Sequence, residues 1–558
     1  MDKVWLKHYP EGMPAEIDAD HYPSLVALLE DSFKKNGRKD AYIFLGRHYS
    51  FADIDQQSRA LMAYFQSLGL ERGDRVALMM PNVPQYPVAV AAVLRAGMVV
   101  VNVNPLYTPR ELEHQLKDSG AKAIVILENF AHVLQHCQKA VAVKHVVLAA
   151  MGDRMGTVKG AVVNYVVRKV KKLVPPFKLD GEPVRFNEAL ALGARLPVKP
   201  VSVGPDDIAV LQYTGGTTGV SKGAVLKHRN IIANLLQSEA WYAPAIRKVP
   251  PGEQLVTICA LPLYHIFAFT VNMMLSLHMG GCNVLVPNPR DLPALFKDLM
   301  RQPFHTFPAV NTLFSAVAHH PDVGKVDWSS MVLSVGGGTA VQQGTARLWM
   351  EKTGCPIIEG YGLSEASPVV ACNPGDSRIY TGTIGMPVPS TEIDIKDDEG
   401  RSLPIGKAGE LCIRGPQVMA GYWQRPDETA RVMTPDGYLR TGDIGIVDER
   451  GYIRLVDRKK DMIIVSGFNV YPNEVEDIVT LMPGVLECAV VGVPDERSGE
   501  AVKLFVVRDR EDLTEAQVRA HCEENLTGYK RPRFIEFRPT LPKTPVGKVL
   551  RRELREAA

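Results

Sequence analysis

The sequence predicts an α/β protein with a large N-terminal domain of layered α/β sub-domains and a small, mobile α+β domain at the C-terminus. Three observations lead to this prediction. The 558 residues are too many for one domain of about 150 residues. Short β-branched runs alternate with helical stretches in the N-terminal part, and after about residue 460 the pattern changes to closely spaced short strands.

The composition limits the possible functions. Hydrophobic residues make up 46% and charged residues 23% of the chain, which is ordinary globular usage and unlike a disordered or membrane-spanning protein. The 64 Lys and Arg residues nearly balance the 62 Asp and Glu residues, so the formal net charge is +2. A protein that captures nucleic acid through bulk electrostatics would be far more basic, so we expect no nucleic acid partner.

The cysteines and the N-terminal residues indicate a cytoplasmic protein. The eight cysteines are scattered singly, without a CxxC pair, so the sequence predicts neither a zinc site nor a disulfide framework. Residues 1–20 lack the basic and apolar regions of a signal peptide, and apolar runs such as 87–94 stop well short of about 18 residues. We therefore expect an intracellular protein that does not span a bilayer.

Residues 75–150 predict successive βαβ units of a parallel sheet. Apolar runs at 76–80, 98–103 and 121–127 are separated by helical stretches. The helix that begins after Thr108 has clear signals, because Thr108 can cap it, Pro109 fits its first turn and Glu111 completes a capping box. Gly120 can end this helix.

Residues 161–178 form a basic amphipathic segment that we expect on the surface. Apolar residues alternate with Arg168, Lys169, Lys171 and Lys172 before the break at Pro175 and Pro176, and Lys178 follows the break. A solvated helix face is the ordinary explanation of this pattern. The alternative is a peripheral contact with an anionic surface, such as the inner face of the cell membrane.

The change of pattern near residue 460 predicts a domain boundary, with an N-terminal domain at 1–459 and a C-terminal domain at 460–558. Strand-like runs at 486–493, 501–507 and 533–537 and a capped helix near Thr514 indicate an α+β unit of about 100 residues. The charged stretch 456–461 between the two parts is suited to a hinge.

Residues 213–223, YTGGTTGVSKG, have the composition of a phosphate-binding loop between the strand 208–212 and a helix-compatible run through Asn230. Glycine N–H groups can approach an anion closely, hydroxyls add donors, and Lys222 adds a positive charge. Ser221 before the lysine and Gly223 after it exclude a Walker A loop. The candidate phosphate-binding residues are Thr214, Gly215, Gly216, Thr217, Thr218, Gly219 and Lys222.

This loop resembles the phosphate loop of the acyl-adenylate-forming superfamily, which includes acyl-CoA synthetases, luciferases and peptide-synthetase adenylation domains. Four further motifs resemble that family in the same order, namely IIEGYGLSEASP (357–368), YLRTGD (438–443), DRKKDMIIVSGFNVYPNEVE (457–476) and PKTPVGKVLRREL (542–554). The stretch 436–463 is most similar to the signature of bacterial long-chain fatty acyl-CoA ligases. The resemblance therefore extends over most of the chain.

The resemblance implies an ATP/AMP site built from these motifs. Tyr361, flanked by Gly360 and Gly362, would be the adenine platform, and Glu365 would ligate Mg²⁺, which prefers oxygen ligands. Asp443 would bind the ribose hydroxyls, with Arg458 as a second contact. The remaining residues of the implied ATP/AMP set are Gly338, Glu359 and Ser364.

The resemblance also implies a two-step reaction with a domain rotation. Lys548 would stabilise the phosphate charge during adenylate formation, together with Lys222 and Glu365. Lys460 would be the hinge, although a linker lysine without a special role is the alternative. After the rotation Gly467 and Phe468 would line a CoA tunnel.

An apolar stretch at 261–270 and the glycines 336–338 belong to the acyl and adenylate pockets in the resembling family. His265 and Phe267 are therefore candidates for the acyl pocket, although His265 fits a core histidine equally well. Close backbone approach explains three successive glycines better than an inert turn.

The leading hypothesis is a long-chain fatty acid–CoA ligase that uses ATP, CoA and Mg²⁺. The alternatives are an adenylate-forming ligase for a medium-chain or aryl carboxylate, and a catalytically silent relative that binds lipid or nucleotide. A homodimer is possible.

Overall fold

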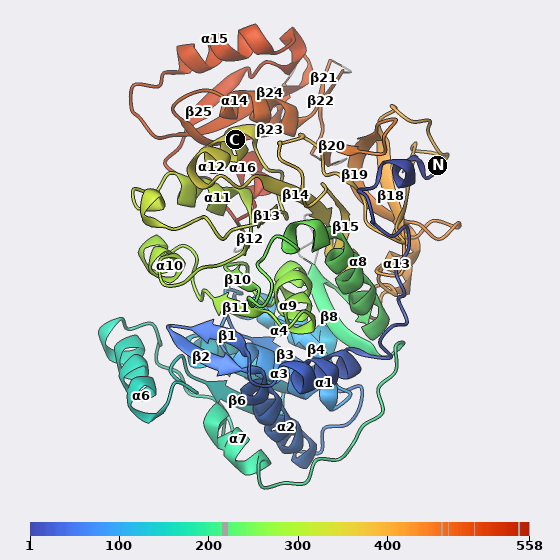
Figure 1. Cartoon of the computed structure of the whole chain (residues 1–558). Helices are drawn as coiled ribbons and strands as arrows, with labels where there is room; N and C mark the ends of the chain where they lie inside the picture. Colours follow the sequence, from blue (N-terminus) through green and yellow to red (C-terminus); the bar gives the residue numbers. More distant parts are fainter. Residues whose placement is uncertain (215–220, 459–460, 467, 496, 545–546, 557–558) are drawn as a thin grey trace.

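The computed structural model describes residues 1–214, 221–458, 461–466, 468–495, 497–544 and 547–556. Four sheets and their helices build the molecule, and the C-terminal part lies at one end (Figure 1). A large mixed α/β N-terminal part and a smaller α+β C-terminal part confirm the predicted fold class.

The first sheet has the strand order β7-β6-β5-β3-β4-β8-β9 and confirms the βαβ prediction. All neighbouring strands are parallel except β9, which runs antiparallel to β8. Its strands are β3 (Arg75–Met79), β4 (Val99–Asn102), β5 (Ala123–Leu127), β6 (His145–Ala149), β7 (Val184–Arg185), β8 (Ile208–Thr214) and β9 (Lys222–Lys227). Its helices are α2 (Phe51–Ser67), α3 (Gln85–Arg95), α4 (Pro109–Ser119), α5 (Ala131–Cys137) and α7 (Phe186–Gly193).

Helix α4 has the ends that the sequence predicts. The Thr108 hydroxyl accepts a hydrogen bond from the N–H of Glu111, and the Glu111 carboxylate accepts one from the N–H of Thr108. Gly120 ends the helix with φ at +61°, a backbone conformation that glycine adopts without the steric cost of a Cβ atom.

The second sheet has the order β16-β15-β14-β13-β12-β10-β11-β1-β2 and carries most of the candidate site. Its strands are β1 (Asp40–Phe44), β2 (Arg47–Ser50), β10 (Val256–Cys259), β11 (Cys282–Leu285), β12 (Thr306–Ala309), β13 (Leu333–Gly336), β14 (Ile357–Gly362), β15 (Val369–Cys372) and β16 (Met386–Pro387). Its helices are α1 (Leu25–Asn36), α8 (His228–Ile246), the π-helix η5 (Ala268–Met274), α9 (Leu275–His278), α10 (Leu292–Leu299), α11 (Asn311–Ala318) and α12 (Gln343–Thr353).

One continuous core joins these two sheets. Alternate residues of the parallel strands face it, for example Val76 and Leu78 on β3 and Leu333 and Val335 on β13. Apolar side chains of α1, α3, α8 and η5 fill the space between the sheets. The two sheets therefore form one packed body, which holds the site residues in fixed positions.

The third sheet is antiparallel, with the order β17-β18-β19-β20. It contains β17 (Glu392–Lys396), β18 (Gly409–Arg414), β19 (Leu439–Val447) and β20 (Ile453–Arg458), and α13 (Pro426–Val432) lies between β18 and β19.

The C-terminal part has its own sheet and core, as predicted. Its strands are β21 (Ile463–Val465), β22 (Phe468–Val470), β23 (Val485–Asp495), β24 (Gly499–Arg508) and β25 (Phe534–Phe537). Its helices are α14 (Pro472–Thr480), α15 (Glu515–Asn525) and α16 (Arg551–Glu556), and Thr514 caps α15 as the sequence predicts. The boundary at 459/460 falls between β20 and β21 and stays a prediction.

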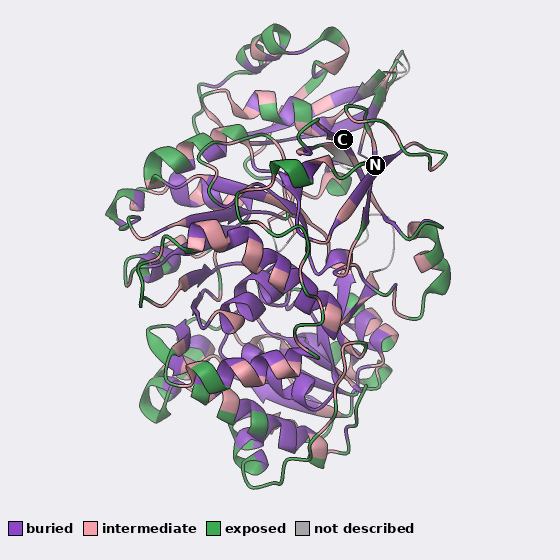
Figure 2. Cartoon of the chain, turned by 45° about the vertical axis from the view of Figure 1, so that its right-hand side comes forward, coloured by how far each residue is buried: buried purple, intermediate pink, exposed green. Residues whose placement is uncertain are grey.

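Residues 157–170 form a surface helix at the outer edge of the molecule. Helix α6 (Thr157–Tyr165) continues into the π-helix η4 (Val166–Val170), and Figures 1 and 2 show this segment projecting with mostly exposed residues. Within the described ranges, every helix is too short or too polar to cross a bilayer. All eight cysteines are buried free thiols.

Candidate functional site

The candidate phosphate loop joins two antiparallel strands. Thr214 at the end of β8 lies opposite Lys222 at the start of β9, whereas the predicted residues Gly215, Gly216, Thr217, Thr218 and Gly219 fall outside the described residues. The expected helix-compatible run directly after the loop is wrong, because helix α8 begins only at His228. Backbone hydrogen bonds from Trp423 to Gly223 and from Val225 to Gly421 hold β9 extended.

Lys222 lies between two side chains that follow β18. Its Nζ is 2.6 Å from Glu428 Oε2 and 5.3 Å from the centre of the Tyr422 ring. An ammonium over an aromatic face is attracted by the ring's negative face. Lys222 is therefore held in place at the start of β9, and the Glu428 carboxylate balances its charge.

Tyr422 also contacts Glu365, the predicted magnesium ligand. The Tyr422 hydroxyl donates a hydrogen bond of 2.8 Å to Glu365 Oε1, and the backbone carbonyl of Glu365 accepts one of 2.7 Å from Met419. Tyr422 therefore links the candidate phosphate lysine and the candidate metal ligand. Our sequence reasoning missed this residue, although the run Gly421-Tyr422-Trp423 resembles the glycine-flanked aromatic at Tyr361.

The predicted adenine and ribose residues lie together. The Tyr361 hydroxyl on β14 donates a hydrogen bond of 2.5 Å to Asp443 Oδ2 on β19. Asp443 is only 7% exposed, and its backbone pairs with that of Arg458 on β20. The side chain of Arg458 lies outside the described part of the chain. Gly360 and Gly362 flank Tyr361 on β14, and Ser364 begins the turn that carries Glu365.

The glycines after β13 allow a close approach between a residue predicted for the nucleotide site and one predicted for the acyl pocket. A Cβ atom on Gly337 would lie 2.9 Å from the Phe267 ring, closer than side chains pack. Gly338 has φ at +78°, which favours glycine. The Phe267 ring therefore packs on the backbone of Gly337, directly before the predicted site residue Gly338.

Glu359 is buried beside this site. Its Oε1 accepts a hydrogen bond of 2.9 Å from the Val341 N–H, and its backbone carbonyl accepts two from Asn373. Burial, together with the nearby Asp477 carboxylate of α14, raises the pKa of Glu359 to about 8 even though the Val341 hydrogen bond lowers it. The carboxyl is therefore mostly protonated at neutral pH.

The C-terminal part brings Lys548 to the site. A Cβ atom on Gly547 would lie 2.7 Å from the Thr312 hydroxyl and 3.1 Å from Val310, so the loop packs on the N-terminal part. The Thr544 N–H donates a hydrogen bond of 2.7 Å to the Lys548 carbonyl, and the Lys548 N–H donates one of 3.0 Å to the Thr544 hydroxyl, so these two residues brace the loop. Helix α14 touches α12 at Gly344 on the same side.

His265 is buried and lies close enough to Lys548 for the two side chains to interact electrostatically. Burial and the Lys548 ammonium lower the pKa of His265 to about 4, so the imidazole is neutral at neutral pH. Its Nδ1 accepts a hydrogen bond from the Phe267 N–H, which leaves the proton on Nε2. His265 therefore acts as a neutral wall residue, and it lies near the residue predicted for catalysis.

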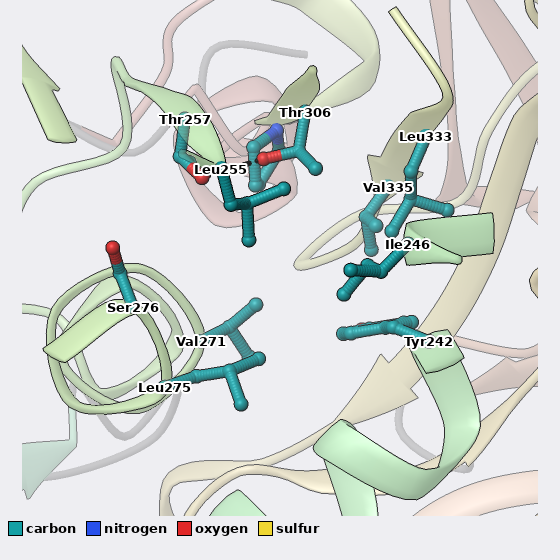
Figure 3. Close-up of a pocket in the computed structure, with 11 residues that line it drawn as sticks. Tyr242, Ile246, Leu255, Thr257, Val271, Leu275, Ser276, Thr306, Leu333 and Val335 are labelled. Carbon is teal, nitrogen blue, oxygen red and sulfur yellow. Dashed lines mark hydrogen bonds between the residues drawn. The ribbon is translucent and has the colours of Figure 1, made fainter. Parts of the chain in front are cut away.

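An apolar pocket is lined by residues of the helices α8, η5 and α9 and of the strands β10, β12 and β13 (Figure 3). Val335 on β13 lines this pocket and lies two residues before Gly337, which follows the end of the strand. In Figure 3, Val271 and Leu275 point towards Tyr242 and Ile246. The space open to a water-sized sphere is only about 20 Å³, so side chains nearly fill it. A long apolar chain can enter only if some of them move.

The predicted hinge and CoA tunnel are only partly described. Lys460 and Gly467 lie outside the described residues. Phe468 is 57% exposed and stacks on Tyr529 with 4.9 Å between the ring centres. Its role stays a prediction.

The donors near Glu365 fit Mg²⁺ held mainly by a nucleotide. Among the described residues, His, Cys, Asp and Glu side chains form no cluster of three that could hold a metal ion. Mg²⁺ commonly uses one or two carboxylates together with substrate phosphates and waters, so the Glu365 carboxylate would fit such an ion when a nucleotide supplies the phosphates.

Comparisons with known proteins cover both parts of the chain. The AMP-binding enzyme family matches residues 29–423, and the AMP-binding enzyme C-terminal domain matches residues 474–548. A long-chain-fatty-acid–CoA ligase of Escherichia coli is 54% identical over 560 residues, covering 100% of this chain and 99% of that protein. Proteins of the same description are 54% identical in Yersinia pestis and 37% identical in Bacillus subtilis, each over at least 98% of both chains.

Solved structures show the same fold. The anthranilate–CoA ligase AuaEII in complex with anthranoyl-AMP superposes with a TM-score of 0.84 at 27% identity, covering 97% of this chain and 99% of that one. ATP-bound MatB from Rhodopseudomonas palustris gives a TM-score of 0.80 at 29% identity, with 97% and 99% coverage. From these matches over its whole length, the chain belongs to the AMP-binding enzyme family.

Proposed function

We propose that the protein is a long-chain fatty acid–CoA ligase. It activates a fatty acid with ATP to acyl-AMP and pyrophosphate, and then transfers the acyl group to the CoA thiol with release of AMP. The observation that carries this proposal is the similarity, over the full length of the chain, to ligases of that description. Three sets of contacts support it, namely those of Lys222 and Glu365 with Tyr422, the hydrogen bond between Tyr361 and Asp443, and the electrostatic interaction of Lys548 with His265.

In the first step a fatty acid carboxylate oxygen attacks the α-phosphorus of ATP, and the bond to pyrophosphate breaks. The carboxylate is already ionised, so no general base is required. Negative charge grows on the phosphate and on the leaving pyrophosphate, where Lys548 and Lys222 supply positive charge. Mg²⁺ on Glu365 would neutralise further phosphate charge when it is bound.

In the second step the CoA sulfur attacks the acyl carbonyl, and the bond to AMP breaks. Lys548 occupies the side of the site near His265, so a thiol needs that space to reach the carbonyl. We propose that a C-terminal domain at 460–558 rotates about Lys460 and then presents Gly467 and Phe468 to a CoA tunnel. The proposed N-terminal domain, 1–459, keeps the nucleotide and acyl sites.

The acyl chain would extend past His265 and Phe267 towards the pocket of Figure 3. Its lining is apolar apart from the hydroxyls of Thr257, Ser276, Thr306 and Tyr242, which suits a hydrocarbon chain. A contact with an anionic membrane, a cytoplasmic location and a homodimer are further proposals. Size measurement in solution would test the homodimer.

A substrate panel tests the function. We expect pyrophosphate release that requires a fatty acid, and acyl-CoA formation that is faster with long-chain than with medium-chain or aryl acids. Asp443→Asn should impair both products, whereas the exposed matched control Asp180→Asn should not. Preference for an aryl acid would replace the long-chain assignment, and absence of pyrophosphate release with every acid would indicate a silent binding protein.

A further inference from the structure

Helix α6 and the π-helix η4 present an outward row of apolar side chains. Val158, Val162, Tyr165 and Val170 are 79%, 57%, 63% and 64% exposed, and Leu173 just beyond is 52% exposed. These five belong to only eighteen large apolar side chains that are exposed among the described residues. Such a concentration within 16 residues marks an interaction surface rather than scattered exposure.

The π-helical turn keeps this row on one face. Residues 158, 162 and 165 follow α-helical spacing, which alone would place Lys169 next in the row. In η4 the hydrogen bonds run from residue i+5 to i, as in the 2.8 Å bond from Lys171 N to Val166 O. The wider π-helical turn brings Val170, five residues after Tyr165, closer to the side of this row than an α-helical turn would, and Lys169 and Val170 are both exposed there.

The opposite face fixes the segment to the body of the protein. Gly160 packs directly on Gly152, and Asn164 Oδ1 accepts a hydrogen bond of 2.7 Å from the Gly152 N–H. Arg168 donates two hydrogen bonds to the buried Glu128 carboxylate, at 2.7 and 2.9 Å. The apolar row therefore points outward from an anchored helix, and the helix cannot rotate to bury these side chains.

The charge around the row selects its partner. The sequence has no acidic residue between Asp153 and Asp180, whereas Lys169, Lys171 and Lys172 are exposed beside the apolar row. A basic border around an apolar stripe fits the interface of an anionic bilayer, which accepts an apolar helix face to a depth of about 5–10 Å. Protein–protein interfaces are depleted in lysine relative to the rest of the surface, so three lysines beside the row favour a bilayer over a protein partner.

We propose that the row Val158, Val162, Tyr165, Val170 and Leu173, with Lys169, Lys171 and Lys172, is a membrane-docking surface for anionic phospholipid. The inference deepens the proposed function, because a long-chain fatty acid would then be taken from the bilayer on which the enzyme sits. Binding itself does not depend on catalysis, so the two claims can fail separately.

The test is sedimentation of the full-length protein with vesicles of phosphatidylcholine, with and without phosphatidylglycerol. We expect binding to the anionic vesicles that weakens with salt. Val162→Asp combined with Tyr165→Asp should abolish it. Reversal of the three lysines to Glu should lower partitioning by at least on the order of 100-fold, because loss of the three positive charges alone accounts for that factor and the new negative charges add repulsion.

Matched controls separate docking from folding and net charge. Leu192→Asp combined with Val198→Asp alters exposed apolar residues elsewhere, and reversal of Lys248, Lys297 and Lys407 changes the net charge equally. Acyl-CoA synthesis from a fatty acid in detergent micelles should be unchanged in all these variants. The proposal would be overturned if the wild-type protein does not sediment with anionic vesicles, or if the docking variants bind these vesicles as strongly as their controls do. Loss of self-association with unchanged vesicle binding would assign the surface to a second copy instead and also overturn it.

Discussion

Replacing Glu359 by Gln should remove a pH-dependent loss of stability. The folded carboxyl has a pKa of about 8 and its ordinary value is 4.5. Because the folded pKa is the higher one, the contribution of this group to stability is fully present below 4.5 and is lost as pH rises through 8. At neutral pH the ionisation of Glu359 lowers the free energy of the unfolded chain, whereas the folded chain keeps this carboxyl mostly protonated.

The size of the effect follows from those two pKa values. Between about pH 5.5 and about pH 7.5 the unfolding free energy should fall by roughly 2.5 kcal/mol through this group alone. If the N-terminal part unfolds as one unit, that free energy corresponds to about 3 °C in Tm. The Gln variant cannot titrate, and its amide oxygen can still accept the Val341 hydrogen bond.

The assay is thermal unfolding of both proteins across this pH range. We expect the Tm of the Gln variant to fall by about 3 °C less than that of the wild type on the same rise in pH. Glu351→Gln is the control, since the Glu351 side chain is 65% exposed. A Tm difference between wild type and Glu359→Gln that stays constant with pH would show that Glu359 is ionised in the folded protein, and the reasoning from burial would be wrong.

Three further variants test the proposed reaction. Lys548→Ala should slow adenylate formation by a factor of roughly 10²–10³ while acyl-AMP is still converted to acyl-CoA, because one charge-stabilising donor is lost from the first step. The same variant should raise the pKa of His265 from about 4, which NMR can measure. Equal damage to both half-reactions would count against the role of Lys548. Glu365→Gln should raise the Mg²⁺ concentration needed for turnover more than it changes Tm, and an unchanged Mg²⁺ titration would exclude Glu365 as a ligand. Lys460→Pro should permit part of the adenylate step and block the thiol step, so that acyl-AMP accumulates in quenched mixtures analysed by mass spectrometry; acyl-CoA formation at the wild-type rate would mean that the rotation does not depend on Lys460.

Local signals in the sequence predicted elements well where the structure is local. The helix after Thr108 follows from its capping box and Gly120, which act within a dozen residues. The strand at Lys222–Lys227 pairs with the nearby strand β8 on one edge, and it was missed because its other edge is held by residues 420–423, which are about 200 positions away. Tyr422 was missed for the same reason, since its place in the candidate site follows from its contacts with Lys222 and Glu365, which are far from it in the sequence.

Motifs identified the residues of the candidate site, but they did not predict how these residues contact one another. Motif similarity identified Tyr361 and Asp443 separately, and only the structure shows their hydrogen bond. It likewise could not show that Gly337 accommodates the Phe267 ring, or that the Lys548 loop packs on Val310 and Thr312. These contacts join distant segments, and spacing along one chain carries no record of them.

The eight buried cysteines bear on the chemistry of the second step. Burial raises the pKa of every one of these thiols, so little reactive thiolate forms on the protein. An enzyme that handles the thiol of CoA therefore offers no nucleophilic sulfur of its own to the activated acyl group. Self-acylation on sulfur and mixed disulfides with oxidised CoA are both disfavoured, which keeps the acyl group for its intended acceptor.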